Sequence, residues 1–254
     1  MRYTKMHGIG NDYLFVFGEV PENAAQLAVK YSNRQSGIGS DGMIYIGSSE
    51  IADFSMRIFN ADGSEAKMCG NGIRCVAKFV REKGYTDKDE LTVETLSGVK
   101  HLLIDGGGVT VDMGKAEISD DLMLDLGFEC IPVSVGNPHA VIFTDDVAPI
   151  LLRDIGPKIE CNKAFPGRVN VEFVSVVGDN ELRMRVWERG SGETLACGTG
   201  ACASAAAAVS KGLCRTGEPI KVHLDGGDLE ITVKNDFTCL MRGPAEFVSE
   251  GNIE

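Results

Sequence analysis

The chain has 254 residues, 43% of them hydrophobic, with 25 basic and 37 acidic side chains that give a net charge of −12. Its length allows one large domain or two of about 125 residues each. The acidic balance argues against partners such as nucleic acid or an anionic membrane surface. The first residues lack the apolar core of a signal peptide, so we expect a cytoplasmic protein.

Hydrophobic periodicity predicts strands that alternate with a few helices. Strands are expected at 14–17, 43–46, 54–58, 91–96, 99–104, 109–113, 182–186, 220–224, 229–233 and 238–241. Helices are expected at 22–32, 72–83, 148–155 and 200–211, with Gly84 and Gly212 placed where a helix C-cap favours glycine. The polar stretch 114–121 is the predicted linker between two halves.

Two short motifs, MCGNG at 68–72 and ACGTG at 196–200, place a cysteine before a glycine-rich turn that opens into a helix. The segments around them align without a gap, 56–77 over 184–205, and share Arg57/Arg185 and Glu65/Glu193 as well as the cysteines. Gly10-Asn11 and Gly136-Asn137 extend the repeat, since each pair precedes a predicted strand. We therefore predict an internal duplication.

The predicted fold class is α+β, with two pseudo-symmetric halves that are each a mostly antiparallel sheet rolled round a central helix. The expected halves are residues 1–115 and residues 116–242, and the C-terminal segment 243–254 is a candidate completion of the first half. We expect the active site in the cleft between the halves.

The eight cysteines do not indicate a disulfide scaffold, because the chain is neither small nor exported. No C-x-x-C occurs, and none of the four histidines pairs with another at ligand spacing, so no metal site is expected. Most of the six other cysteines are interpreted as buried small hydrophobes: Cys75, Cys130, Cys161, Cys202, Cys214 and Cys239.

Cys69 and Cys197 are the candidate catalytic residues. A helix N-terminus stabilises a thiolate and lowers its pKa, and its free N–H groups form a site for a carboxylate. Two such turns on opposite sides of one carbon would let one thiol remove a proton while the other returns it from the opposite face. A single cysteine at a glycine-rich helix start more often has a structural role than a catalytic one. The second cysteine at the matching position of the repeat favours the catalytic role here. The alternative interpretation of Arg74 and Arg189 is that they are surface charges without a role in the site.

The chain resembles the diaminopimelate epimerase family in motifs that run almost end to end. They are KMHGIGNDYLFV at 5–16, SGIGSDG at 36–42, RIFNADGSEAKMCGNGIRC at 57–75, VGNPHAV at 135–141, RVNVEF at 168–173 and VWERGSGETLACGTGA at 186–201. The resemblance implies an isomerase for lysine and peptidoglycan precursor biosynthesis that interconverts LL- and meso-diaminopimelate without pyridoxal phosphate or any other cofactor. It also implies that Cys69 and Cys197 are the two acid/base thiols and that His139 and Glu188 tune them. The substrate contacts that it implies are Asn11, Asn60, Gly70, Asn71, Asn137, Asn170, Glu188, Arg189, Gly198 and Thr199.

One position departs from part of that family, because Gly42 stands where some members have a substrate-binding glutamine. Members are often homodimers, and the sequence itself carries no evidence on assembly. Two alternatives stay open: a racemase of another amino acid that uses the same two thiols, as in the proline racemases, and a thiol module that binds a soft metal ion.

Overall fold

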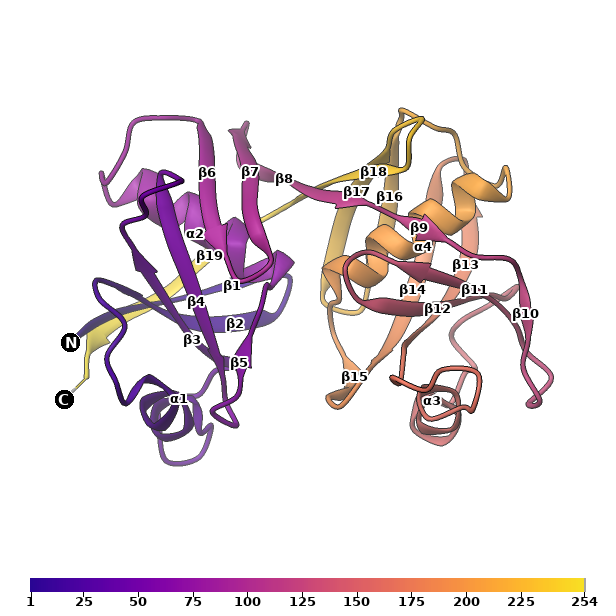
Figure 1. Ribbon diagram of the computed structural model, residues 1–254, viewed down its shortest axis with the longest axis horizontal. Coiled ribbons are helices and arrows are strands. Elements are labelled where there is room, and N and C mark those ends of the chain that lie inside the picture. The colour runs from indigo at the N-terminus through magenta and orange to yellow at the C-terminus, as the bar shows by residue number, and fades with distance from the viewer. Residues whose placement is uncertain (254) are drawn as a thin grey trace. The chain divides into compact units, whose positions relative to one another are not determined.

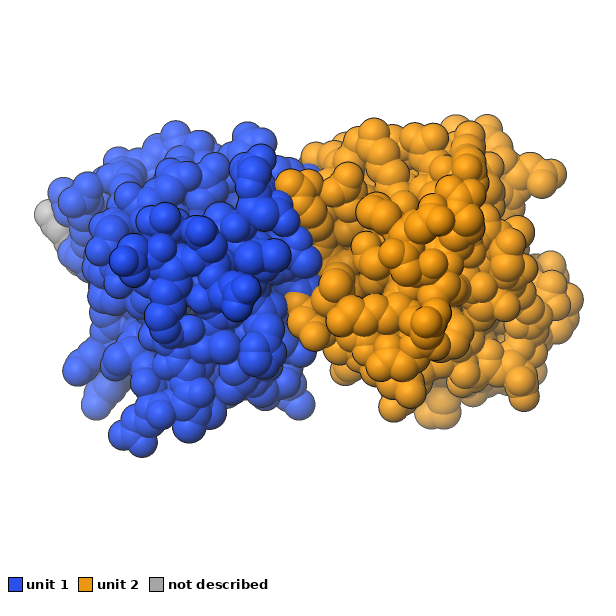
Figure 2. All heavy atoms as spheres, turned by 90° about the horizontal axis from the view of Figure 1, so that it is seen from above, with its two compact units in different colours: residues 1–111, 243–254 blue, residues 112–242 orange. Residues whose placement is uncertain are grey.

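The computed structural model describes residues 1–253, which divide into two compact units: residues 1–111 with 243–253, and residues 112–242 (Figure 2). The first unit thus includes the C-terminal segment. The predicted linker 114–121 is not an irregular connection, because it contains the end of one strand and the short strand β9, Glu117–Ile118.

The first unit is a strongly bent sheet around one helix, α2 (Figure 1). β1 pairs with β19 on one side and with β2 on the other, and β2 continues in parallel to β3. β4 joins β3 to the meander of β6, β7 and β8. The elements are β1 Arg2–Gly8, β2 Asn11–Phe17, α1 Ala24–Ser32, β3 Gly42–Gly47, β4 Phe54–Asn60, β5 Glu65–Ala66, α2 Gly70–Glu82, β6 Glu90–Thr95, β7 Gly98–Asp105, β8 Gly108–Lys115 and β19 Glu246–Asn252.

The second unit repeats this order of elements. β11 pairs with β9 and β12, β12 runs parallel to β13, and β14 leads in parallel to the meander β16, β17 and β18. The elements are β9, β10 Leu122–Met123, β11 Glu129–Ser134, β12 Pro138–Phe143, α3 Leu152–Glu160, β13 Asn170–Gly178, β14 Glu181–Glu188, β15 Gly192–Thr194, α4 Gly198–Ser210, β16 Pro219–Leu224, β17 Gly227–Val233 and β18 Thr238–Gly243. The predicted duplicated α+β architecture is confirmed.

The two central helices differ in how completely their sheets enclose them. α4 consists mainly of the small residues Ala, Gly, Ser and Cys and is buried from Gly198 to Ala208 except at Thr199, because small side chains let the strands approach closely. α2 buries one face and presents Lys78, Arg81 and Glu82 at its surface. Both helices end at a glycine with positive φ, Gly84 at 74° and Gly212 at 68°, as the C-cap pattern predicts.

The helix predicted at 148–155 is wrong in its bounds, because α3 runs from Leu152 to Glu160. The Asp146 side chain accepts a hydrogen bond from the Ala148 N–H at 2.9 Å. That bond holds residues 146–148 in a turn, so the helix begins later. The prediction that most of the six other cysteines are buried is confirmed: five are, and Cys161 at the end of α3 is exposed.

Candidate functional site

Each candidate cysteine is the N-cap residue of the central helix of its unit. Both have extended backbone, with φ −138° for Cys69 and −127° for Cys197. The sulfur of Cys69 accepts a hydrogen bond from the Gly72 N–H at 3.3 Å, and that of Cys197 accepts one from the Gly200 N–H at 3.4 Å. Both thiols therefore lie against the free N–H groups of a helix N-terminus.

In the first unit an asparagine from the β1–β2 turn contacts the thiol. The Asn11 carbonyl oxygen accepts from Cys69 Sγ at 3.3 Å and from Asn71 Nδ2 at 3.4 Å. Its Nδ2 donates to the Asp41 carboxylate at 2.7 Å, which fixes the orientation of the amide. The carbonyl end of Asn11 is thus held toward the sulfur.

Arg74, one turn into α2, is fully buried, so its interpretation as a surface charge is wrong. Its guanidinium donates to the carbonyl of Gly70 at 3.2 Å, to the Asn71 side chain at 2.9 Å and to the Pro244 carbonyl at 3.2 Å. It stabilises the turn that carries Cys69. The burial of Arg74 results from tertiary packing around α2, so the amphipathic pattern of the helix sequence did not reveal it.

In the second unit the buried Glu172, the half-buried Glu188 and the buried His139 gather around Cys197. Burial raises the pKa of the Cys197 thiol well above its usual value, and the nearby Glu188 and Glu172 carboxylates raise it further. Burial likewise raises the pKa of Glu188, which accepts a hydrogen bond from the Thr194 hydroxyl. The expectation of a lowered thiol pKa is therefore wrong for Cys197, because desolvation and negative charge outweigh the helix N-terminus.

His139, Asn137 and Thr199 connect these groups. The His139 ring nitrogens contact Glu172 Oε1 at 2.7 Å and Asn137 Oδ1 at 3.0 Å. Asn137 donates in turn to the Thr199 hydroxyl at 3.3 Å, and that hydroxyl lies 3.5 Å from Cys197 Sγ. Glu172, which sequence reasoning did not select, is completely buried and lies within RVNVEF, one of the family motifs.

The predicted residues Asn170 and Arg189 are joined to each other. Asn170 is buried; its carbonyl oxygen accepts from the Arg189 N–H at 2.8 Å and its Nδ2 donates to the Pro138 carbonyl at 3.1 Å. The Arg189 guanidinium donates to the Gly167 carbonyl at 3.0 Å. Asn60, at the end of β4, donates to the Ser64 hydroxyl at 3.0 Å and has no described bond to the Cys69 group.

Gly42 has no room for a side chain. A Cβ there would lie 2.3 Å from the Phe59 carbonyl oxygen and 3.0 Å from the Tyr13 ring. Tyr13 is buried, and burial raises its pKa well above the usual value, with Cys69 as a further cause. The aromatic ring of Tyr13 therefore occupies space beside Gly42, and a glutamine there would require the backbone to move.

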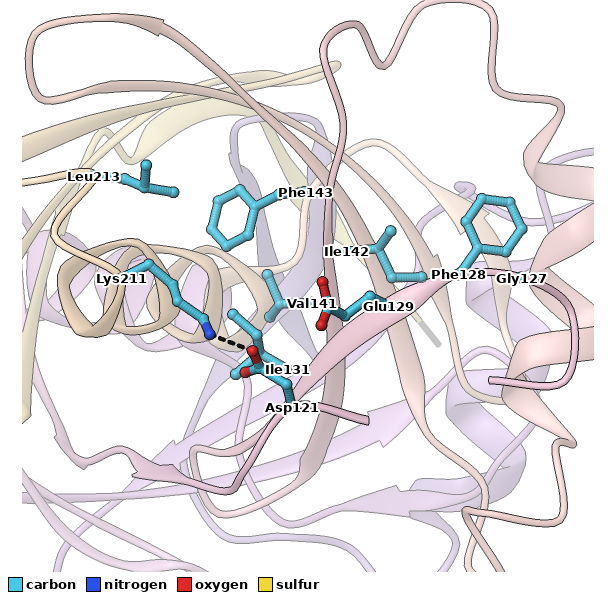
Figure 3. A pocket seen from close by; sticks show the side chains of 10 residues that line it. All are labelled: Asp121, Gly127, Phe128, Glu129, Ile131, Val141, Ile142, Phe143, Lys211 and Leu213. Carbon is cyan, nitrogen blue, oxygen red and sulfur yellow. Dashed lines mark hydrogen bonds and ion pairs between the residues drawn. The ribbon is translucent and has the colours of Figure 1, made fainter. Parts of the chain in front are cut away.

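A groove in the second unit lies elsewhere. It is an open groove of about 470 Å³ beside β11, β12 and the end of α4, lined by apolar side chains such as Phe128 and Phe143 and crossed by the Lys211–Asp121 ion pair (Figure 3). It includes none of the predicted site residues. Among residues 1–253 no cluster of three metal-ligating side chains occurs, and no helix has the length and apolar character to cross a bilayer.

Solved structures with this architecture include enzymes that act on amino acids. A phenazine biosynthesis protein of the PhzF family from Bacillus anthracis superposes with a TM-score of 0.79 at 17% identity, covering 100% of this chain and 99% of that chain. A hydroxyproline epimerase from Agrobacterium vitis superposes with a TM-score of 0.70 at 16% identity, covering 99% of this chain and 91% of that chain. The fold is therefore that of the two-unit epimerases and their structural relatives.

The sequence comparisons are more specific. The family model for diaminopimelate epimerase matches residues 3–119 and 131–248. Diaminopimelate epimerases from Bacteroides thetaiotaomicron and Phocaeicola vulgatus are 50% and 49% identical, each covering 100% of this chain and 98% of the relative. One from Methanococcus maripaludis is 46% identical over the full length of both chains. The chain belongs to the diaminopimelate epimerase family and is an enzyme of the isomerase class.

Proposed function

We propose that the protein interconverts LL- and meso-diaminopimelate by moving the proton at one α-carbon between two thiols, Cys69 and Cys197. The observation that carries the proposal is the repeat of one local arrangement. In each unit a cysteine caps the central helix, accepts a bond from the N–H three residues on, and lies within the reach of an asparagine-containing turn. Inversion at carbon needs a group on each face, which two such units can supply.

In the proposed reaction the free N–H groups at Gly70-Asn71 and Gly198-Thr199 bind the reacting carboxylate. These N–H groups also stabilise the negative charge that develops on that carboxylate when the α-proton leaves. The two thiols supply both proton transfers, so no cofactor takes part in the proposed reaction.

In the proposed reaction each thiol acts as the base in one direction and as the acid in the other. Burial and the nearby Glu188 and Glu172 carboxylates raise the pKa of Cys197, which favours its protonated form.

Recognition of the remote amino acid centre is proposed for Asn60, Asn170, Glu188 and Arg189. The planar guanidinium of Arg189 can bind both oxygens of a second carboxylate, and carboxylate or amide oxygens suit an ammonium group. A substrate with a single carboxylate lacks the second carboxylate and the ammonium group that these residues are proposed to bind, which costs orders of magnitude in kcat/KM. We therefore expect turnover of LL- and meso-diaminopimelate and essentially none of proline or lysine.

The test is turnover of LL-diaminopimelate in deuterium oxide, followed by a coupled assay and by mass spectrometry. We expect deuterium at the α-carbon of the inverted product, because the returning proton comes from a thiol that exchanges with solvent. Arg189→Ala should lower kcat/KM severely without creating activity on monocarboxylates. Comparable turnover of proline would instead establish the racemase alternative, and retention of the original hydrogen would contradict the two-thiol route.

The proposal extends to a cytoplasmic enzyme whose partner is a small-molecule substrate and which binds neither nucleic acid nor membrane, in line with its net charge of −12. Homodimerisation is proposed from the family alone. Light scattering on the purified protein tests it directly.

A further inference from the structure

The ionisable side chain of Glu172 is completely buried. It is 0% exposed, on β13 of the sheet that encloses α4. One oxygen contacts His139 Nδ1 at 2.7 Å, and the other, Oε2, is buried with no hydrogen-bond partner. Burying a carboxylate in this way costs free energy, so stability alone does not explain it.

The duplicated unit shows what the fold requires at this position. In the register of the parallel pairs, His139 lies opposite Asn170 as Tyr13 lies opposite Gly42, so Glu172 corresponds to Ile44. The helix starts agree: a Cβ on Gly200 would lie 2.7 Å from Glu172 Oε1, and one on Gly72 would lie 2.6 Å from Ile44 Cδ1. The first unit thus builds the same sheet and helix contact with an apolar side chain.

The contacts of Glu172 lead to the thiol. Asn137 donates its Nδ2 to Thr199, so its carbonyl oxygen faces His139 Nε2, and that nitrogen must carry a proton. In the hydrogen bond between His139 Nδ1 and Glu172, the proton is either on Nδ1 or on the carboxyl group. In both cases Nε2 carries a proton and donates it to Asn137. The orientation of Asn137, and through it that of the Thr199 hydroxyl beside Cys197, therefore depends on Glu172.

The first unit orients its own asparagine with a carboxylate as well. Asp41 accepts from Asn11 Nδ2 at 2.7 Å and leaves the carbonyl oxygen of Asn11 facing the Cys69 sulfur. A carboxylate thus orients the asparagine near the thiol in both units. In the first unit Asp41 bonds to the asparagine directly, and in the second Glu172 acts through His139.

We propose that Glu172 is a positioning residue of the epimerisation reaction, which acts on Cys197 through His139, Asn137 and Thr199. Its contribution is to fix the protonated nitrogen of His139 and thereby the direction of the amide and hydroxyl groups that contact the thiol. The part of this inference that concerns rate rests on the proposed function, whereas the part that concerns His139 does not.

Two substitutions separate orientation from folding. Glu172→Ile installs the residue that the first unit has at this position, so we expect thermal stability equal to or above that of the wild type. Because His139 Nδ1 loses its partner, kcat should fall about 10-fold or more with a much smaller change in KM. Glu172→Gln can donate an amide N–H to Nδ1 and keep Nε2–H on Asn137, so kcat should stay within about 3-fold of the wild type.

Glu193→Gln is the matched control. Glu193 pairs with Arg185 in the second unit as Glu65 pairs with Arg57 in the first, and it lies outside the relay. This variant should lose some stability and retain its kcat. Retention of kcat by Glu172→Ile, or an equal loss in a folded Glu172→Gln, would overturn the proposal.

A spectroscopic measurement tests the relay without the substrate. The chain has four histidines, so nitrogen-15 NMR of labelled histidine resolves each ring, with His139→Gln used for assignment. We expect a protonated Nε2 on His139 in the free enzyme and in Glu172→Gln. An unprotonated Nε2 in the wild type would overturn the relay even if diaminopimelate is turned over, and failure of turnover with a protonated Nε2 would refute only the proposed function.

Discussion

At the scale of single residues, the two thiols occupy equivalent positions in unlike surroundings. Cys69 is partly exposed beside neutral amides and the buried Arg74, whereas Cys197 is 5% exposed beside two acids. The helix N-terminus, shared by both, cannot therefore set their protonation alone. The nearby carboxylates raise the pKa of Cys197 further than burial alone does.

Replacing either thiol should abolish epimerisation in a folded protein. Cys69→Ala and Cys197→Ala each remove a group that the other cannot replace, and general acid–base groups contribute about 10²–10⁴-fold each. The coupled assay on LL-diaminopimelate measures the loss, and circular dichroism checks the fold. Cys161→Ala, at an exposed cysteine outside the site, should retain activity. More than about a tenth of wild-type activity in either of the first two variants would contradict the two-thiol mechanism.

The sequence predicted the cysteines, His139 and Glu188 because they lie in recognisable motifs, but it gave no reason to select Glu172 or Asp41. Glu172 lies at a strand position that an apolar residue occupies in the other unit, so sequence periodicity does not mark it as functional. Only its contact with His139 in the structure shows its role. Asp41 becomes relevant because β3 places it beside Asn11, 30 residues away along the chain. Such through-space partners have no periodicity to reveal them.

At the scale of elements, the meander strands and the central helices were predictable because their apolar periodicity and glycine caps are local. The strands β1, β11, β13 and β19 were not among the predicted ones. The start of α3 was not predictable, since a side-chain bond from Asp146 decides it. The crossings from β4 to β6 and from β14 to β16 were also not predictable, as parallel pairing is decided by the wrapping of the sheet around α2 and α4.

The parallel crossing in the first unit depends on Asp53, just before β4. Lys88 and the Thr92 N–H lower the pKa of Asp53 to about 2. A carboxyl group with a lowered folded-state pKa adds stability above its unfolded pKa of about 3.9, and that stability is lost as the pH falls toward about 2. Asp53→Asn should therefore cost about 1 kcal/mol at neutral pH, because the pair is partly exposed, and the cost should shrink below about pH 4.

Urea unfolding of wild type and Asp53→Asn between about pH 7 and pH 3 measures this difference. Lys88→Met is the comparison, since it removes the ion pair and leaves the bonds to Thr92, and it should cost less. A difference between wild type and Asp53→Asn that is independent of pH would contradict the assignment.

At the scale of the whole molecule, the sheet of each unit includes a strand that pairs with one that is not its neighbour along the chain. β9 covers β11 in the second unit, and β19, from the end of the chain, covers β1 in the first. Ile253 adds to the first unit's core, and the Pro244 carbonyl accepts from Arg74. The first unit therefore cannot be complete without the last residues of the described chain.

Deletion of residues 245–254 should unfold the first unit selectively. It uncovers the edge of β1 and removes Ile253 from the core, and an exposed strand edge also promotes aggregation. Hydrogen exchange should show lost protection in β1 and β2, with β11 and β12 unchanged because β9 remains. Equal loss of protection in both units would mean that they unfold as one cooperative body.

Oxidation tests the pairing of the two units in the proposed reaction. Both thiols must reach one carbon atom, so in the absence of substrate their sulfurs should be able to form a disulfide, and partial exposure of Cys69 favours its attack by a mild oxidant. We expect diamide to abolish activity and dithiothreitol to restore it, with a Cys69–Cys197 peptide in the non-reduced digest. Cys161→Ser removes the exposed thiol that would otherwise react first and should leave this outcome unchanged. A linkage between any other pair in the inactive form, or inactivation with both thiols still free, would show that the two helix starts do not serve one carbon.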